Sequence, residues 1–283
     1  MASILSSNSY GKSAVRVLKV ERHGPRHVIR ELAVDIALEG EFTTAHTHGD
    51  NSAVLPTDTM KNTVYAKARE IDIGEPEEFA IMLTSHFLAA SAPASSARVS
   101  IAESGWRRLM VDGAAHEHAF ERSGNELRVA RVVRRRGAEP EVVAGIDNLL
   151  ILKSASSGFA GYPRDEYTTL RETDDRILAT SITARWRYHA GASTFGAGFD
   201  AVRGAMLQTF AGHDSKSVQH TLHAMGEAAL ASCGDVDEIS ITMPNKHYLL
   251  ADLAPFGLDN PNEIFVPTSE PYGLIEATLR RST

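Results

Sequence analysis

The chain has 283 residues, enough for two average domains or one large one. Hydrophobic residues make up 43% and charged residues 23%, which is ordinary globular usage and excludes disorder over most of the length. The formal charge of -7 excludes a general attraction to nucleic acid or anionic lipid, so an anionic ligand must be held by local donors.

Apolar periodicity predicts two strands and a helix in the first third of the chain. From Leu32 to Leu38 apolar side chains recur with a period of two, which predicts a half-buried strand, and the segment from Val15 to Val20 is its expected partner. Pro76 suits a first helical position, and apolar residues then recur every four residues. We therefore expect a helix from about 76 to 90.

Two more strands complete the first half, and the second half predicts a similar order of elements. One strand runs from Val99 to Val111 and the next passes through Leu127 and Val129, with a turn at Asp112-Gly113 between them. The elements expected in the second half are a strand from 178 to 188, helices from 202 to 210 and 218 to 225, and strands from 239 to 243 and near 271 to 280.

This order, strand, strand, helix, helix, strand, strand in each half, predicts two α+β units in tandem. The segment 134–148 (RRRGAEPEVVAGIDN) is polar and contains Gly and Pro, so it is the expected linker. We place the first unit at 10–136 and the second at 137–283. Residue identities barely repeat between the halves, so the prediction rests on the pattern of elements.

Several features favour a cytoplasmic location. No stretch approaches the ~20 apolar residues of a membrane span, and the first residues lack the regions of a secretory signal. Cys233 is the only cysteine, so an intramolecular disulfide is impossible and a reducing compartment fits. The last residues, RRST, differ from a peroxisomal tripeptide.

Two pairs of histidines have a spacing that some metal sites use. His46 and His48, and likewise His116 and His118, alternate as residues on one face of a strand do. The chain has no HExxH array and no paired cysteines, so surface or hydrogen-bonded histidines are the alternative interpretation.

Two charged clusters each allow a functional and a structural interpretation. Arg134–Arg136 could contact phosphate or could form a solvated strand end. Asp165 and Glu166, with Asp174 and Asp175 nearby, could supply the two carboxylates of a glycoside hydrolase or could simply face solvent. A Gly-rich phosphate loop, a GxSxG elbow and a dinucleotide fingerprint are all missing from the sequence.

Six short segments resemble uricases in content and order, and together they span nearly the whole chain. They are YGK at 10–12, PTDTMKNTVYA at 56–66, GFAGYPRDEYTTLRET at 158–173, DDRIL at 174–178, SVQ at 217–219 and PNKHY at 244–248. The resemblance implies the tunnelling fold (T-fold), in which antiparallel sheets with helices on one face form a barrel on oligomerisation. It also implies a homotetramer with active sites at subunit interfaces.

The resemblance assigns ligand-binding roles in the second half of the chain. Phe159 matches the aromatic residue that stacks on the purine ring, and Arg176 matches the arginine that holds the urate anion. Gln219 matches the amide that faces the arginine across the ligand, and Val218 the backbone contact beside it.

The remaining roles involve both ends of the chain. Thr57 and Asp58 match a pair that reaches the ligand from the neighbouring subunit, largely through backbone N–H groups. Lys12, Thr57 and His247 match the proton relay, and Asn245 lies next to the position where oxygen or water sits above the ring.

The implied activity is the oxidation of urate by molecular oxygen to 5-hydroxyisourate and hydrogen peroxide, with neither metal nor organic cofactor. A pterin or purine hydrolase of the same fold is the main alternative, and a non-catalytic purine-binding module is another. Oxygen uptake with urate distinguishes the oxidase from both.

Overall fold

The computed structural model describes residues 3–282, which form an α+β structure with antiparallel strands. The chain divides into two compact units. Unit 1 comprises the residues up to Gly145 together with Arg187–Ala197, and unit 2 comprises Ile146–Trp186 and the residues from Gly198 onward. The predicted boundary between residues 136 and 137 stays a prediction.

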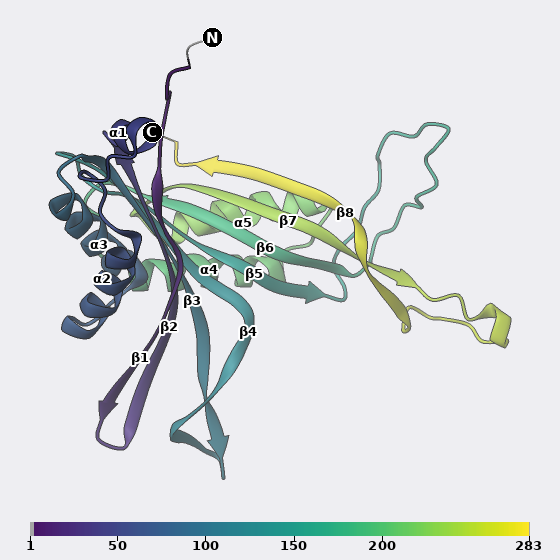
Figure 1. Ribbon diagram of the computed structural model, residues 1–283. Helices are drawn as coiled ribbons and strands as arrows, with labels where there is room; N and C mark the ends of the chain where they lie inside the picture. Colours follow the sequence, from purple (N-terminus) through teal and green to yellow (C-terminus); the bar gives the residue numbers. More distant parts are fainter. Residues whose placement is uncertain (1–2, 283) are drawn as a thin grey trace. The chain divides into compact units, whose positions relative to one another are not determined.

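Unit 1 has a sheet in which strands that follow one another in the chain are hydrogen-bonded neighbours. Its elements are β1 (Tyr10–His23), β2 (Arg26–Gly40), α1 (Thr43–His48), α2 (Thr57–Glu70), α3 (Pro76–Ala90), β3 (Ala94–Val111) and β4 (Ala114–Arg135). Helix α2 packs against β1, and α3 packs against β3 and β4 (Figure 1). The helices thereby bury the apolar side of the sheet.

In unit 2 the strands again pair in chain order. The elements are β5 (Glu141–Lys153), β6 (Leu178–Tyr188), α4 (Phe195–Gly212), α5 (Val218–Ser232), β7 (Val236–Leu250), a short 3-10 helix (Ala254–Phe256) and β8 (Phe265–Arg280). Strand β5 and helix α4 each begin in unit 1 and continue in unit 2. Helix α5 packs against β7 and β8.

The period-two prediction for the first hairpin is confirmed. In the antiparallel pairing of β1 with β2, Val15 lies opposite Val34 and Val17 opposite Leu32. All four side chains are buried, at 7% exposure or less. The predicted helix from 76 to 90 is confirmed as α3, and the Asp112-Gly113 turn joins β3 to β4.

The linker predicted at 134–148 is wrong in extent. Strand β4 continues to Arg135 and β5 begins at Glu141, so only residues 136–140 connect them. Val142, Ala144 and Ile146 alternate on the buried side of β5, a strand signal that the flanking Gly and Pro residues obscured. Strand β5 precedes β6 and supplies the first strand of the second half.

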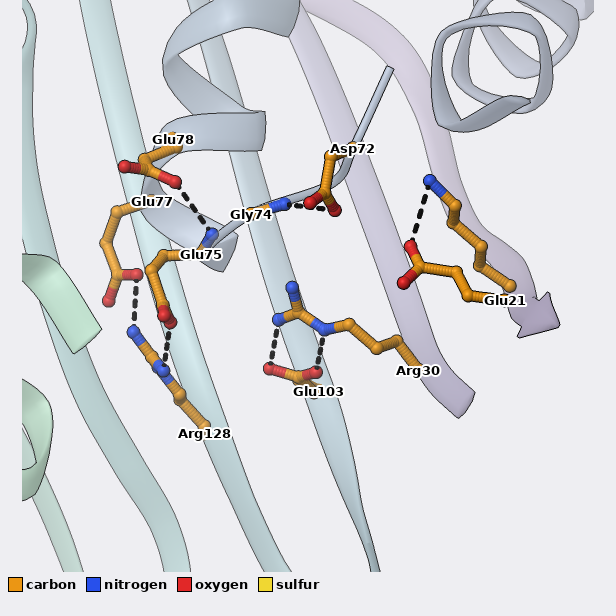
Figure 2. Close-up of polar contacts among 10 residues, drawn as sticks. Glu21, Arg30, Asp72, Gly74, Glu75, Glu77, Glu78, Glu103 and Arg128 are labelled. Atoms are coloured by element: carbon orange, nitrogen blue, oxygen red, sulfur yellow. Dashed lines mark hydrogen bonds and ion pairs between the residues drawn. The ribbon is translucent and has the colours of Figure 1, made fainter. Parts of the chain in front are cut away.

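The N-terminal end of α3 is fixed to β4 by a buried charged cluster. Glu75 and Glu78 form a capping box at the start of the helix. The guanidinium of Arg128, on β4, lies 2.5 Å from the Glu75 carboxylate and 2.8 Å from that of Glu77. Figure 2 shows it between these two side chains. Burial raises the pKa of Glu77, and the charge of Arg128 opposes that rise. Removing Arg128 would leave a fully buried carboxyl group without its cation.

Candidate active site

The YGK segment places Lys12 at an irregular point of strand β1. The register with β2 shifts between Lys12 and Val15, and Ala14 in that interval has a positive φ of 54°. A side chain at position 11 would overlap the carbonyl oxygen of Ile36, so the close approach of the two strands requires Gly11. A bulge of this kind turns a side chain away from its regular direction in the strand, and this bulge lies just after Lys12.

Tyr10 connects this strand to the segment that leads into α2. The backbone N–H of Leu55 donates to Tyr10 Oη at 2.9 Å. The Tyr10 ring packs edge-on against Phe42, with centroids 4.8 Å apart. The hydrogen bond fixes the segment that ends at Pro56 relative to the strand that carries Lys12, and the ring contact holds the Tyr10 side chain in place.

Thr57 and Asp58 are the first two residues of α2. Pro56 is the N-cap and offers no side-chain acceptor, so the first backbone N–H groups of the helix remain available to an anion. The Asp58 carboxylate accepts hydrogen bonds from Lys61 at 2.5 Å and Asn62 at 3.2 Å. The hydrogen bond from Lys61 is the largest cause that lowers the pKa of Asp58, and the nearby charge of Lys12 lowers it further. The charge of Lys12 therefore acts on the start of α2.

In unit 2, hydrogen bonds hold three chain segments side by side. Phe159 and Thr173 exchange two backbone hydrogen bonds, at 2.7 and 3.1 Å. The N–H of Arg176 donates to Ser157 O at 2.7 Å, and the N–H of Gly158 donates to Ser215 O at 2.8 Å. The segments that carry Phe159 and Arg176 are thereby joined to the segment that leads into α5.

Arg176 has an unsatisfied, partly desolvated guanidinium. Its Cζ lies 5.2 Å from the centroid of the Phe159 ring. Its Nε is buried and has no hydrogen-bond partner among the described residues. Burial lowers the pKa of Arg176, although an arginine remains charged at neutral pH. A buried charged donor without a partner is costly, and a bound anion would remove that cost.

Val218 and Gln219 are the first two residues of α5. The Ser217 side chain caps the helix by accepting from the N–H of His220 at 3.1 Å. Val218 is buried, whereas the Gln219 side chain is exposed. The helix start thus offers backbone N–H groups and a free amide, a combination suited to an anionic heterocycle.

A cavity of about 170 Å³ lies beside Phe159 and Arg176. Asn245 and His247, from β7, also line it. The register of β7 with β8 shifts between these two residues, so the pair, like Lys12, lies at a bulge. The cavity is smaller than the roughly 300–1,000 Å³ of sites for larger ligands, so its size suits a small molecule.

The predicted site residues divide between the two units. Unit 1 holds Lys12, Thr57 and Asp58, which we call the N-terminal group. Unit 2 holds the C-terminal group, which comprises Phe159, Arg176, Val218, Gln219, Asn245 and His247. Within the C-terminal group, the cavity brings together Phe159, Arg176, Asn245 and His247, while Val218 and Gln219 are connected to them through Ser215.

The two histidine pairs have different structural settings. His46 and His48 lie in helix α1, so the expectation that they share a strand face is wrong, since residues two apart on a helix do not face each other. His116 and His118 lie on β4 with ring centroids 4.7 Å apart. Within residues 3–282, no group of three or more His, Cys, Asp or Glu side chains is placed to hold a metal ion.

The charged clusters have structural contacts. Arg136 donates to three backbone carbonyls near the end of α3, those of Leu88, Ser91 and Ala94, at 2.8 to 2.9 Å. Asp165 accepts from Tyr167 N and Thr168 Oγ1 within its own loop.

No helix in the described part of the chain is both long and apolar enough to cross a membrane.

Comparison with known proteins supports the resemblance along nearly the whole chain. The family model described as Uricase matches residues 8–133 and 142–276. The chain is 46% identical to the uricase of Arthrobacter globiformis over 98% of this chain and 90% of that protein. It is 38% identical to the uricase of Dictyostelium discoideum over 100% of this chain and 99% of that protein.

Solved structures agree with the sequence comparisons. The crystal structure of the Arthrobacter globiformis uricase has a TM-score of 0.93 at 46% identity and covers 99% of this chain and 96% of its own. The urate oxidase of Bacillus sp. TB-90, at 23% identity, has a TM-score of 0.85 over 97% of this chain and all of its own, which supports the fold alone. The chain therefore belongs to the uricase family.

Proposed function

We propose that this protein is a urate oxidase that converts urate, molecular oxygen and water into 5-hydroxyisourate and hydrogen peroxide, without a metal or organic cofactor. The observation that carries the proposal is the buried Nε of Arg176, beside Phe159 at the cavity, which has no partner in the part of the chain that the structure describes. A planar anion that stacks on Phe159 places a hydrogen-bond acceptor in the plane of the Arg176 guanidinium, where the Nε–H can donate to it. Family membership identifies the anion as urate.

In the proposed reaction the C-terminal group binds and orients the ligand. Arg176 and Gln219 hold opposite edges of the urate anion, the N–H of Val218 contacts it, and Phe159 stacks on one face. Asn245 holds oxygen, and later water, above the other face. Fixed donors of this kind stabilise charge on the ring without reorganisation during the reaction.

The N-terminal group supplies the proton relay and further backbone donors. Lys12, Thr57 and His247 remove a proton, and the electron-rich ring gives two electrons to oxygen. Oxygen takes up two protons and leaves as hydrogen peroxide. Water then adds to the oxidised ring, which yields 5-hydroxyisourate.

The proposal includes the assembly of the enzyme. Each site combines the C-terminal group of one chain with Lys12, Thr57 and Asp58 of another, in a homotetramer whose T-fold sheets close into a barrel. The enzyme acts in the cytoplasm on a small molecule, and neither nucleic acid nor membrane is a partner.

Oxygen uptake with urate tests the proposed reaction directly. We expect the purified protein to consume oxygen on addition of urate and to release hydrogen peroxide in equal amount. Uptake should persist after exhaustive chelation, because the proposed chemistry uses the substrate itself as the electron donor. Loss of turnover on chelation, with recovery on adding back one metal, would refute the proposal that the reaction needs no cofactor. Urate binding without oxygen uptake would favour a hydrolase or a binding module.

Replacing Tyr10 by Phe should lower turnover more than it lowers affinity. The substitution keeps the ring on Phe42 but removes the acceptor for Leu55 N, a bond worth about 0.5–1.5 kcal/mol. We expect kcat to fall several-fold because Lys12 and Thr57 lose their fixed separation. Tyr167→Phe, at a side chain that is 81% exposed, is the matched control. Equal kcat values for both variants would contradict a role for Tyr10 in positioning the relay.

A further inference from the structure

The loop between β5 and β6 carries Phe159 and Arg176 at its two ends. The paired backbone hydrogen bonds of Phe159 and Thr173 close the base of this loop. Beyond that base, residues 160–172 are largely exposed. A ring placed at the base of an exposed loop keeps its orientation only if the loop itself is braced.

Tyr162 turns back from the loop onto Phe159. The two rings are nearly parallel, at 15°, with centroids 4.9 Å apart. The Tyr162 hydroxyl donates to Leu170 O at 2.7 Å, across the loop. The N–H of Gly161 donates to Glu172 Oε1 at 3.2 Å, which adds a second bond across the loop.

Cations flank the pair of rings. Arg176 Cζ lies 5.2 Å from the centroid of Phe159, and Arg164 Cζ lies 5.6 Å from the centroid of Tyr162. Arg164 is in turn 3.8 Å from the carboxylate of Glu172. The four side chains Arg176, Phe159, Tyr162 and Arg164 therefore follow one another in contact, each pair within the range of aromatic or cation–π attraction.

Tyr162 contacts Phe159 without being part of the cavity lining. Phe159 and Arg176 both line the cavity, whereas Tyr162 lies outside its lining. The stack therefore supports the Phe159 ring and leaves the cavity beside that ring to a ligand.

We infer that Tyr162 is a positioning residue for the purine-binding ring, and that its stacking on Phe159 sets the affinity for the heterocycle. The inference rests on the proposed function, because it concerns the same site. It predicts an effect on binding that the proton relay does not share, since Tyr162 contacts neither Lys12 nor His247 in any described interaction.

The test compares Tyr162→Leu with Tyr162→Phe. Leucine removes the stack, so we expect the urate KM to rise about 3- to 10-fold, the range of an aromatic pair, while kcat changes less than about twofold. Phenylalanine keeps the stack and loses only the exposed bond to Leu170, so it should restore a KM near that of the unaltered protein. Tyr167→Leu, in the same loop and 81% exposed, is the control.

Anaerobic urate binding separates this inference from the proposed reaction. Without oxygen no turnover occurs, so the Kd of urate reports binding without catalysis, and it should follow the order of the KM values. An unchanged Kd and KM for Tyr162→Leu would overturn the inference, as would a Tyr162→Phe variant as impaired as Tyr162→Leu. A protein that binds urate in this pattern but consumes no oxygen would instead overturn the proposed reaction and leave the role of Tyr162 standing.

Discussion

Replacing Arg176 by Ala is expected to weaken urate binding by about 2 to 5 kcal/mol, the range for breaking a buried charged hydrogen-bond pair. The Nε of Arg176 is buried and has no hydrogen-bond partner within residues 3–282, so its hydrogen-bonding capacity is left for the ligand. Arg176→Lys keeps the charge but loses the planar fork, so its Kd should fall between those of alanine and arginine. The measurement is anaerobic urate titration, in which the Kd is free of catalytic terms.

Arg107→Ala is the control for that titration. The Arg107 side chain is 69% exposed and pairs with Glu121 at the surface, where an ion pair contributes little. Its Kd for urate should match that of the unaltered protein. An unchanged Kd for Arg176→Ala would remove this residue from the site and with it the observation that carries the proposed function.

Much of the fold was predictable because one side of each strand is buried. The alternation from Leu32 to Leu38 and the four-residue period of α3 are direct consequences of burial on one side of each element. Strand β5 was missed because its buried residues lie within a segment that contains the turn residues Gly137 and Pro140. Turn residues at the start of a segment do not indicate whether the residues after them form a strand.

The candidate site could be predicted only by resemblance. Lys12 and Asp58 are far apart in sequence, and no spacing rule predicts that the charge of one acts on the other. The Asp58 contacts with Lys61 and Asn62 do have a sequence signal, since residues three and four apart on a helix are neighbours. That signal is visible in TDTMKN once the helix is assigned.

The contacts of the two tyrosines had no comparable signal. Tyr10 binds the backbone N–H of Leu55, a group that every residue except proline carries. Tyr162 reaches Phe159 only because the loop folds back between them. Side-chain contacts with backbone groups depend on the path of the chain, and so do the contacts made by irregular loops. Neither kind of contact produces a periodic pattern in the sequence.

The second large effect concerns the assembly of the site. If Thr57 acts on urate held by Arg176 of another chain, then a Thr57→Ala chain and an Arg176→Ala chain are each inactive alone. Mixed during refolding, they form some interfaces in which an intact N-terminal group meets an intact C-terminal group. Random equal mixing should restore about a quarter of the sites, because each site draws one group from each of two chains.

A mixture of the unaltered chain with the Thr57→Ala/Arg176→Ala double variant calibrates this result. Under shared sites it should also yield about a quarter of the full activity, whereas sites built within single chains would yield about half. The two mixtures contain the same lesions in the same amounts. Rates are compared per amount of mixed oligomer recovered, so differences in refolding yield do not enter the comparison.

The most direct test of the account is thus the oxygen uptake rate of the two mixtures, measured side by side on mixed oligomers verified by mass. Shared sites predict equal rates for the complementation mixture and the calibration mixture, each about a quarter of the rate of the unaltered protein. No uptake from verified mixed oligomers of Thr57→Ala and Arg176→Ala, with about half the full rate from the calibration mixture, would contradict it. That result would place the N-terminal and C-terminal groups of each site in one chain.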